Sequence, residues 1–235
     1  MARFRIGKIF CALLCGFLAL PVWALSDYRA TYDISVRGVN AGRATYEVRL
    51  SDHSYQVETQ IKPSLAAKML GFGKITEQAY GEIEAGHVLP KKYQRTMEGD
   101  SQYRLVYDYK LMNQEIEAQI GNTQTVLKYD EHVQPLDILA LIVQSLLDEE
   151  HQRIAEQYSL INEDKIRTYS VAAMPNERWQ THSGEAVDVV AYKQTSGNRR
   201  TKIYFANHPL RLVKLVQYKD DEARFSLKLI NYQIL

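Results

Sequence analysis

The sequence of 235 residues is almost neutral, with 29 lysine and arginine residues against 28 aspartate and glutamate residues. This balance argues against nucleic acid as a partner and against a polybasic membrane patch, because both need a clustered positive excess. Hydrophobic residues make up 46% of the chain, which is enough for a sizeable core.

The first 24 residues have the layout of a secretory signal peptide. Arg3, Arg5 and Lys8 form a basic head, and residues 9–22 are almost all apolar. This run is shorter than the roughly 20 residues that a helix needs to cross a membrane. Residues 22–24, Val-Trp-Ala, end the run with small or modest side chains at the positions that a signal peptidase reads.

We expect cleavage after Ala24, which leaves residues 25–235 as a single β-rich periplasmic domain without a transmembrane segment. Cys11 and Cys15 leave with the leader, so the mature chain has no disulfide to stabilise it. A lipid anchor on Cys15 is the alternative, but Leu14 stands where a small residue is expected.

Most of the mature chain alternates between apolar and polar residues. Tyr28, Tyr32 and Ile34 share one face of a strand, and a glycine-containing turn at 38–42 leads into a second alternating strand. Further alternating runs are expected at 55–61, 75–84, 88–97, 102–112, 115–120, 125–129, 157–161, 165–173, 186–194, 201–206, 211–219 and 223–234. This series predicts a mainly β fold, an antiparallel curled sheet or partly open barrel.

Residues 135–150 break the alternation and predict one buried helix. Their apolar side chains cover most of the helix surface, which is typical of a helix buried on more than one side. We expect Leu139, Ile142 and Leu146 to pack against the concave side of the sheet, with the helix joining two halves of it.

Residues 64–72 predict a short helix followed by a loop. Leu65, Met69 and Phe72 share one side of it, and Gly71 and Gly73 flank its end. We hypothesise that this segment is a lid whose three apolar side chains touch an apolar ligand, because glycines absorb hinge-like backbone changes. The alternative is that the three residues are ordinary core.

Residues that carry chemistry are sparse. No two of the six histidines lie within four residues of each other, so we predict no metal site. There is no G-x-S-x-G motif and no cysteine in the mature chain, so we assign no catalytic residue and no cofactor.

Several segments together carry a family resemblance. They are residues 32–44, 86–93, the apolar helix after Pro135, residues 177–184 and residues 203–212. Their order resembles the exported bacterial family called domain of unknown function 3108, over about residues 27 to 234. The resemblance implies a periplasmic, mostly antiparallel β protein and brings no catalytic residues. A curled sheet with a helix against its hollow side is also similar to periplasmic lipoprotein carriers, which bind acyl chains there.

We therefore predict a non-enzymatic periplasmic protein that binds a lipid or an acyl chain in the hollow between sheet and helix. The alternative is an interaction or assembly factor that contacts other envelope proteins through a sheet edge or through the loop at Phe72. A hydrolase ranks below both.

Overall fold

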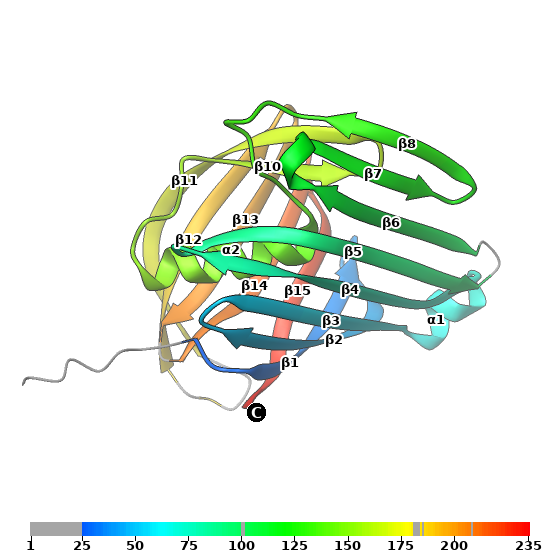
Figure 1. Ribbon diagram of the computed structural model, residues 1–235. Coiled ribbons are helices and arrows are strands. Elements are labelled where there is room, and N and C mark those ends of the chain that lie inside the picture. Colours follow the sequence, from blue (N-terminus) through cyan, green and yellow to red (C-terminus); the bar gives the residue numbers. More distant parts are fainter. Residues whose placement is uncertain (1–24, 100–101, 181–183, 185, 208) are drawn as a thin grey trace, which may run out of the picture.

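The structure of the protein is a computed structural model that describes residues 25–99, 102–180, 184, 186–207 and 209–235. The expected signal peptide of residues 1–24 lies outside the described residues. Most described residues belong to one sheet (Figure 1). Its first strands are β1 (Tyr28–Val36), β2 (Val39–Ser51), β3 (Ser54–Pro63), β4 (Phe72–Glu84), β5 (His87–Gly99), β6 (Tyr103–Lys110), β7 (Glu115–Ile120) and β8 (Thr123–Lys128).

The chain continues with β9 (Pro135–Leu136), β10 (Gln157–Asn162), β11 (Lys165–Gln180), β12 (Ala186–Ser196), β13 (Arg199–Asn207), β14 (Leu210–Lys219) and β15 (Glu222–Ile234). Two α-helices interrupt the strands, α1 (Leu65–Met69) and α2 (Ile138–Glu150), together with a short 3-10 helix, η1 (Leu111–Asn113).

The strands follow the order β8–β7–β6–β5–β4–β3–β2–β1–β15–β14–β13–β12–β11–β10–β9 across the sheet. All neighbours are antiparallel except β9 and β10, which are parallel. Pairing of β1 with β15 joins the two halves, whereas β8 and β9 are outer edges. The sheet curls around α2 without closing (Figure 1), which confirms the predicted fold class with one buried helix and one short helix.

The core of the sheet is rich in tyrosine. Nine of the sixteen tyrosines are buried: Tyr28, Tyr32, Tyr46, Tyr55, Tyr93, Tyr107, Tyr109, Tyr158 and Tyr204. Rings on adjacent strands stack, as Tyr93 and Tyr107 do with centroids 5.5 Å apart. These rings therefore act mainly as cross-strand packing groups, which suits the β propensity of tyrosine.

Helix α2 lies against the concave face of the sheet and contacts β3, β4, β5, β10 and β14 (Figure 1). Leu139, Val143 and Leu146 are fully buried there. Ile142 also packs against this core, as expected, but it is only half-buried, whereas Leu139 and Leu146 are fully buried.

The start of α2 differs from the predicted helix of residues 135–150. Asp137 caps the helix, and its Oδ1 accepts hydrogen bonds from the backbone N–H groups of Leu139 and Ala140, both at 2.9 Å. Pro135 and Leu136 lie before this cap and form β9. Within the described part of the chain, every helix falls short of the length and apolar character that crossing a bilayer requires.

Candidate binding site at the α1 end of the sheet

The three residues expected to touch a ligand lie together at one end of the sheet. Leu65 and Met69 belong to α1, between β3 and β4, and Phe72 is the first residue of β4. The three side chains are 76%, 82% and 58% exposed. None of them belongs to the core. Leu70, which follows α1, and Val39, the first residue of β2, are also exposed. We call Val39, Leu65, Met69, Leu70 and Phe72 the apolar tip.

Ser64 holds the apolar tip together. Its Oγ accepts a hydrogen bond from the N–H of Ala67 at 3.2 Å and so caps α1. The same hydroxyl donates to the carbonyl of Asn40 at 3.1 Å, and the N–H of Ser64 donates to the carbonyl of Ala41 at 2.9 Å. These bonds fix α1 against the β1–β2 turn, which brings Val39 to the tip.

Glycines at the base of the tip allow two backbones to approach closely. A Cβ on Gly73 would lie 1.9 Å from the carbonyl oxygen of Glu98, so only glycine fits there. Gly99 has a φ of +119°, a conformation that other residues rarely adopt. These glycines are therefore required where β4 and β5 meet.

Lysines surround the tip. Lys62 and Lys68 are exposed, and Lys74 is half-buried at the start of β4. Within the described residues, none of these three lysines forms an ion pair. The tip therefore combines exposed apolar side chains with unpaired positive charges.

An apolar row lies on the concave face behind the tip. Ile61, Ile75, Met97 and Tyr103 pair in register across β3, β4, β5 and β6. All four side chains are half-buried, in contrast to the fully buried residues beside α2. Helix α2 therefore packs against one part of the concave face, and this row keeps apolar surface accessible.

The next row inward is polar. Glu77 is 4% exposed, and its Oε1 accepts a hydrogen bond at 2.7 Å from both the Arg95 guanidinium and the Tyr93 hydroxyl. Burial and the neighbouring Glu77 raise the pKa of Tyr93. Burial acts to lower the pKa of Arg95, but the attraction of Glu77 prevails and raises it. Glu77 and Arg95 therefore form an ion pair in which the carboxylate is buried and the arginine side chain is 33% exposed.

Hydroxyl groups near this row lack hydrogen-bond partners. Thr59 Oγ1 and the hydroxyls of Tyr55 and Tyr103 are buried without a partner among the described residues. Burial raises the pKa of the Tyr103 hydroxyl, which therefore stays a neutral donor. Buried hydroxyls are normally hydrogen-bonded, so these three are exceptions, and of the three only Tyr103 belongs to the half-buried row.

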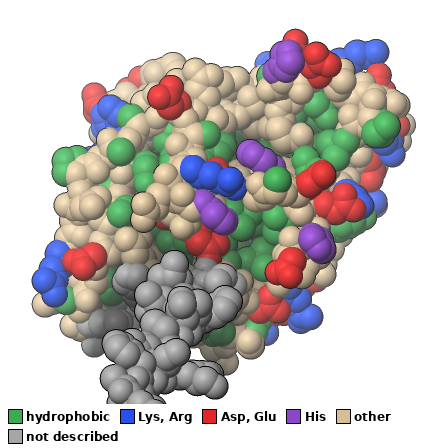
Figure 2. Space-filling view, turned by 60° about the vertical axis from the view of Figure 1, so that its left-hand side comes forward, with side chains coloured by type: hydrophobic (Ala, Val, Ile, Leu, Met, Phe, Trp, Pro, Cys, Tyr) green, Lys and Arg blue, Asp and Glu red, His purple; other side chains and the backbone are tan. Residues whose placement is uncertain are grey.

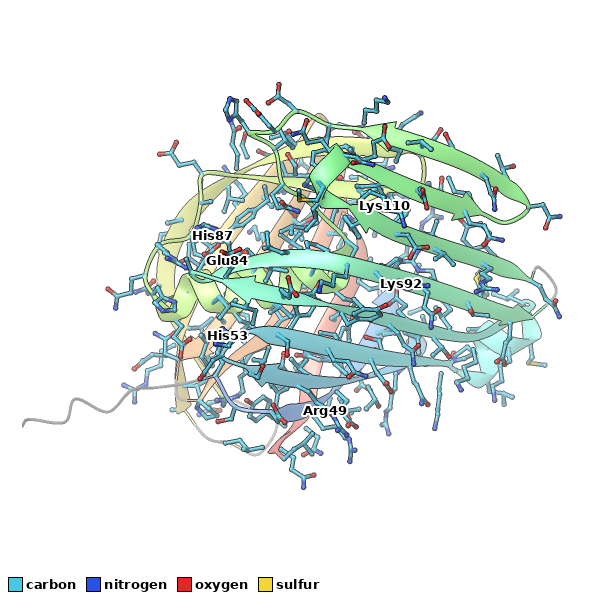
Figure 3. The ribbon with its side chains drawn as sticks, in the orientation of Figure 1. Arg49, His53, Glu84, His87, Lys92 and Lys110 are labelled. Atoms are coloured by element: carbon cyan, nitrogen blue, oxygen red, sulfur yellow. The ribbon has the colours of Figure 1, made fainter. Side chains whose placement is uncertain are left out.

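The opposite end of the strands has a different surface. His53, Glu84 and His87 lie at the turns there (Figure 3). Figure 2 shows this end with acidic, basic and histidine side chains scattered among apolar ones. Among the described residues, no group of three or more His, Cys, Asp or Glu side chains could hold a metal ion.

The ion pair between Glu77 and Arg95 was not predicted from the sequence. Ile75, Glu77 and Ala79 alternate in β4, and this spacing already puts Glu77 on the inward face with its apolar neighbours. Tyr93 and Arg95 are spaced in the same way in β5. The alternation in these two adjacent strands therefore places one charged residue of each on the inward face, which could have predicted the ion pair.

Comparisons with known proteins agree with this geometry. The crystal structure of a β-barrel-like protein of the domain of unknown function DUF1849 from Brucella abortus is similar, with a TM-score of 0.56 and 13% sequence identity. The similarity covers 90% of this chain and 98% of that one, and it concerns the fold. A search of functionally curated proteins gives no match. The model of the family described as protein of unknown function (DUF3108) matches residues 27–227, so the resemblance inferred from the sequence is confirmed and the chain belongs to that family.

Proposed function

We propose that the protein is a non-enzymatic binding protein of the periplasm and that the apolar tip takes up the acyl chain of a lipid. One observation carries this proposal. Eleven large apolar side chains are exposed in the described residues, and six of them, Val36 and the five residues of the tip, lie at this end. Clustered exposed apolar side chains mark contact sites for apolar partners, whereas scattered ones need no explanation.

The apolar row of the concave face supports the same proposal. Ile61, Ile75 and Met97 are half-buried and lie between the tip and the Glu77–Arg95 pair. An acyl chain that leaves the tip would meet apolar surface first and polar groups deeper in. The fully packed surroundings of α2 favour this end of the hollow over the helix side.

Positive charge around the tip suits a lipid with an anionic headgroup. Lys62 and Lys68 are exposed and have no acidic partner among the described residues. Each would attract a nearby anion, an interaction that salt weakens. The periplasmic location rests on the layout of residues 1–24 described above.

Binding of a fluorescent long-chain fatty acid tests the proposal. We expect saturable binding to the protein and its loss in the double variant Met69→Asp/Phe72→Asp, because two carboxylates make the tip polar. Both side chains are exposed, so the melting curve should stay unchanged. Met112→Asp is a matched control, because Met112 is 96% exposed and belongs to η1 instead of the tip.

Absence of fatty-acid binding by the unmodified protein would refute the proposal. Equal loss of binding in the Met112→Asp control would show that the probe adheres to exposed apolar side chains in general. Loss of stability in the double variant would mean that the tip supports the core.

A second candidate, an assembly factor for envelope proteins, is favoured by the edge strand β8. Its outer edge has no neighbouring strand in the sheet, and Val126 in its middle is 51% exposed. An extended segment of another protein could add to such an edge. A photocrosslinker at position 126 should capture a partner in cells if this function holds, and the acyl-binding function predicts no such product.

A further inference from the structure

Strands β14 and β15 separate partway along their length (orange and red in Figure 1). Their pairing ends at Lys214 opposite Lys228, whereas the pairing of β15 with β1 continues to Ile234. Val213 in β14 and Ile230 in β15 are extra residues at shifts of register in the ladders with β13 and β1. Such bulges bend strands, which explains why β14 and β15 diverge here.

The separation opens a groove of about 810 Å³. Residues of β14 and β15 form its two sides, and Arg178 and Trp179 from the end of β11 complete it. Apolar side chains, among them Val213 and Leu229, form part of the lining. The groove therefore has the mixed character of a ligand site, apolar with a few charged groups.

A buried arginine lines the groove. Arg211 is only 6% exposed, and its guanidinium donates a hydrogen bond to the carbonyl of Pro209 at 2.7 Å. The guanidinium also lies 5.6 Å from the centroid of the Tyr232 ring. Neither group carries a full negative charge, and a buried cation without one is costly. The remaining donors of Arg211 are thus suited to an anion.

Two lysines add to this charge. Lys214 and Lys228 lie directly opposite each other in the last pair of the ladder, where like charges are destabilising. Lys214 Nζ lies 5.2 Å from the Trp179 ring centroid and 5.8 Å from that of Tyr204, so aromatic faces hold it. Within the described residues, no carboxylate forms an ion pair with Lys214, Lys228 or Arg211.

The described charged residues that line the groove are all positive. Its described residues include the four cations Arg178, Arg211, Lys214 and Lys228 and no acidic residue. Two carboxylates lie beside the groove and have partners of their own. Glu177 accepts a hydrogen bond from Trp179 Nε1 at 2.6 Å, and an Asp188 oxygen lies 4.0 Å from Arg178 Nε. Convergent arginine and lysine groups with an apolar wall are the chemistry that recognises a phosphate carrying an apolar substituent.

We propose that this groove binds the phosphate group of an amphiphilic phosphate ester. Arg211, Lys214 and Lys228 hold the phosphate, and Trp179 and Leu229 contact the apolar part. The groove is formed by β11, β14 and β15, whereas the apolar tip belongs to the other half of the chain. The two proposals therefore stand or fall separately.

Trp179 makes binding directly measurable. In protein carrying Trp23→Phe it is the only tryptophan, and it lies in the groove. The probes are inorganic phosphate, dodecyl phosphate below its micelle concentration, and the uncharged detergent dodecyl maltoside. We expect a saturable change of Trp179 emission with dodecyl phosphate, weakened by salt, and little change with dodecyl maltoside.

Charge variants identify the site. Lys228→Gln should weaken dodecyl phosphate binding about tenfold, because a charge-assisted hydrogen bond is lost. Lys228→Gln should change the midpoint of urea unfolding little, because it removes the repulsion by Lys214 on β14 together with the attraction of Asp33, which lies opposite Lys228 on β1. Lys193→Gln is the matched control, since it removes one charge from the other cross-strand lysine pair, Lys193 and Lys202, outside the groove.

The outcomes are distinct. Equal affinity for inorganic phosphate and dodecyl phosphate identifies free phosphate as the ligand, whereas much tighter binding of dodecyl phosphate identifies a lipid headgroup. The proposal is overturned if neither phosphate probe binds, if dodecyl maltoside binds as well as dodecyl phosphate, or if Lys228→Gln binds like Lys193→Gln. The Met69→Asp/Phe72→Asp variant should bind dodecyl phosphate normally. The test of the groove can therefore be interpreted even if the apolar tip does not bind fatty acid.

Discussion

The side-chain oxygen of Gln144, in the middle of α2, accepts a hydrogen bond from the backbone N–H of Val88 at 2.7 Å. The Gln144 amide nitrogen donates to the carbonyl of Gly86 at 3.1 Å and to the Asp148 carboxylate at 2.9 Å. One buried amide thus ties the helix to the β4–β5 turn, 56 residues earlier in the chain. Arg153 donates to the same Gly86 carbonyl and reinforces the link.

Gln144→Met should lower the free energy of unfolding by about 1–3 kcal/mol, because it leaves the buried N–H of Val88 without its partner. Urea denaturation measures this change. Ser145→Ala is the control, since the Ser145 hydroxyl bonds only to Leu141 of its own helix among the described residues, and it should change stability much less. Similar effects of both variants would contradict the role of the Gln144 amide.

Leu146→Ala should cost about 2–5 kcal/mol, because Leu146 is fully buried and its truncation leaves a cavity. The half-buried Ile142 provides the comparison, and Ile142→Ala should cost clearly less. Thermal or urea unfolding of both variants checks the order. The reverse order would mean that α2 presents another side to the sheet.

Arg95→Met should destabilise the protein by about 3–5 kcal/mol, because it leaves the buried Glu77 carboxylate without its counter-ion. Adding Glu77→Gln to Arg95→Met should recover part of the loss, since no buried charge then remains. A double-mutant cycle by urea denaturation measures the coupling between the two residues. Independent, additive losses would argue against a coupled pair.

The pattern of apolar and polar residues along the chain predicted most strands, but not the details that depend on packing between elements distant in the sequence. The period-two alternation, as in Tyr28, Tyr32 and Ile34, located most strands because one face of each is buried. The start of α2 was placed too early because Pro135 also fits an added strand, which only the presence of β10 decides. Helix periodicity likewise did not show that Val143 is buried more deeply than Ile142.

The candidate sites were predictable to different degrees. Leu65, Met69 and Phe72 were recognisable because they are adjacent in the sequence and apolar. The cationic groove was not, because Arg211, Lys228 and Trp179 come from separate strands and meet only where two bulges part β14 from β15. An almost neutral composition conceals such a local excess of positive charge.

Asp137 should make the stability of the protein depend on pH. Burial raises the pKa of its carboxyl from 3.8 to about 7, against the smaller opposing effect of the N–H groups of Ala140 and Leu139. The Tyr109 hydroxyl, which donates to Oδ2 at 3.4 Å, also opposes the shift. Between about pH 4 and pH 7 the folded protein therefore holds a proton that the unfolded chain has lost.

This difference in bound protons lowers the free energy of unfolding as pH rises through that window, by up to about 1.4 kcal/mol per pH unit. Asp137→Asn keeps an oxygen that caps α2 but does not titrate, so it serves as the reference. Urea unfolding of both proteins from pH 4 to pH 8 gives the difference in stability. We expect the stability of the natural protein relative to Asp137→Asn to fall up to about pH 7 and then to level off. A constant difference would mean that the pKa of Asp137 is the same in the folded and the unfolded protein, and a difference that rises from pH 4 would mean that folding lowers this pKa.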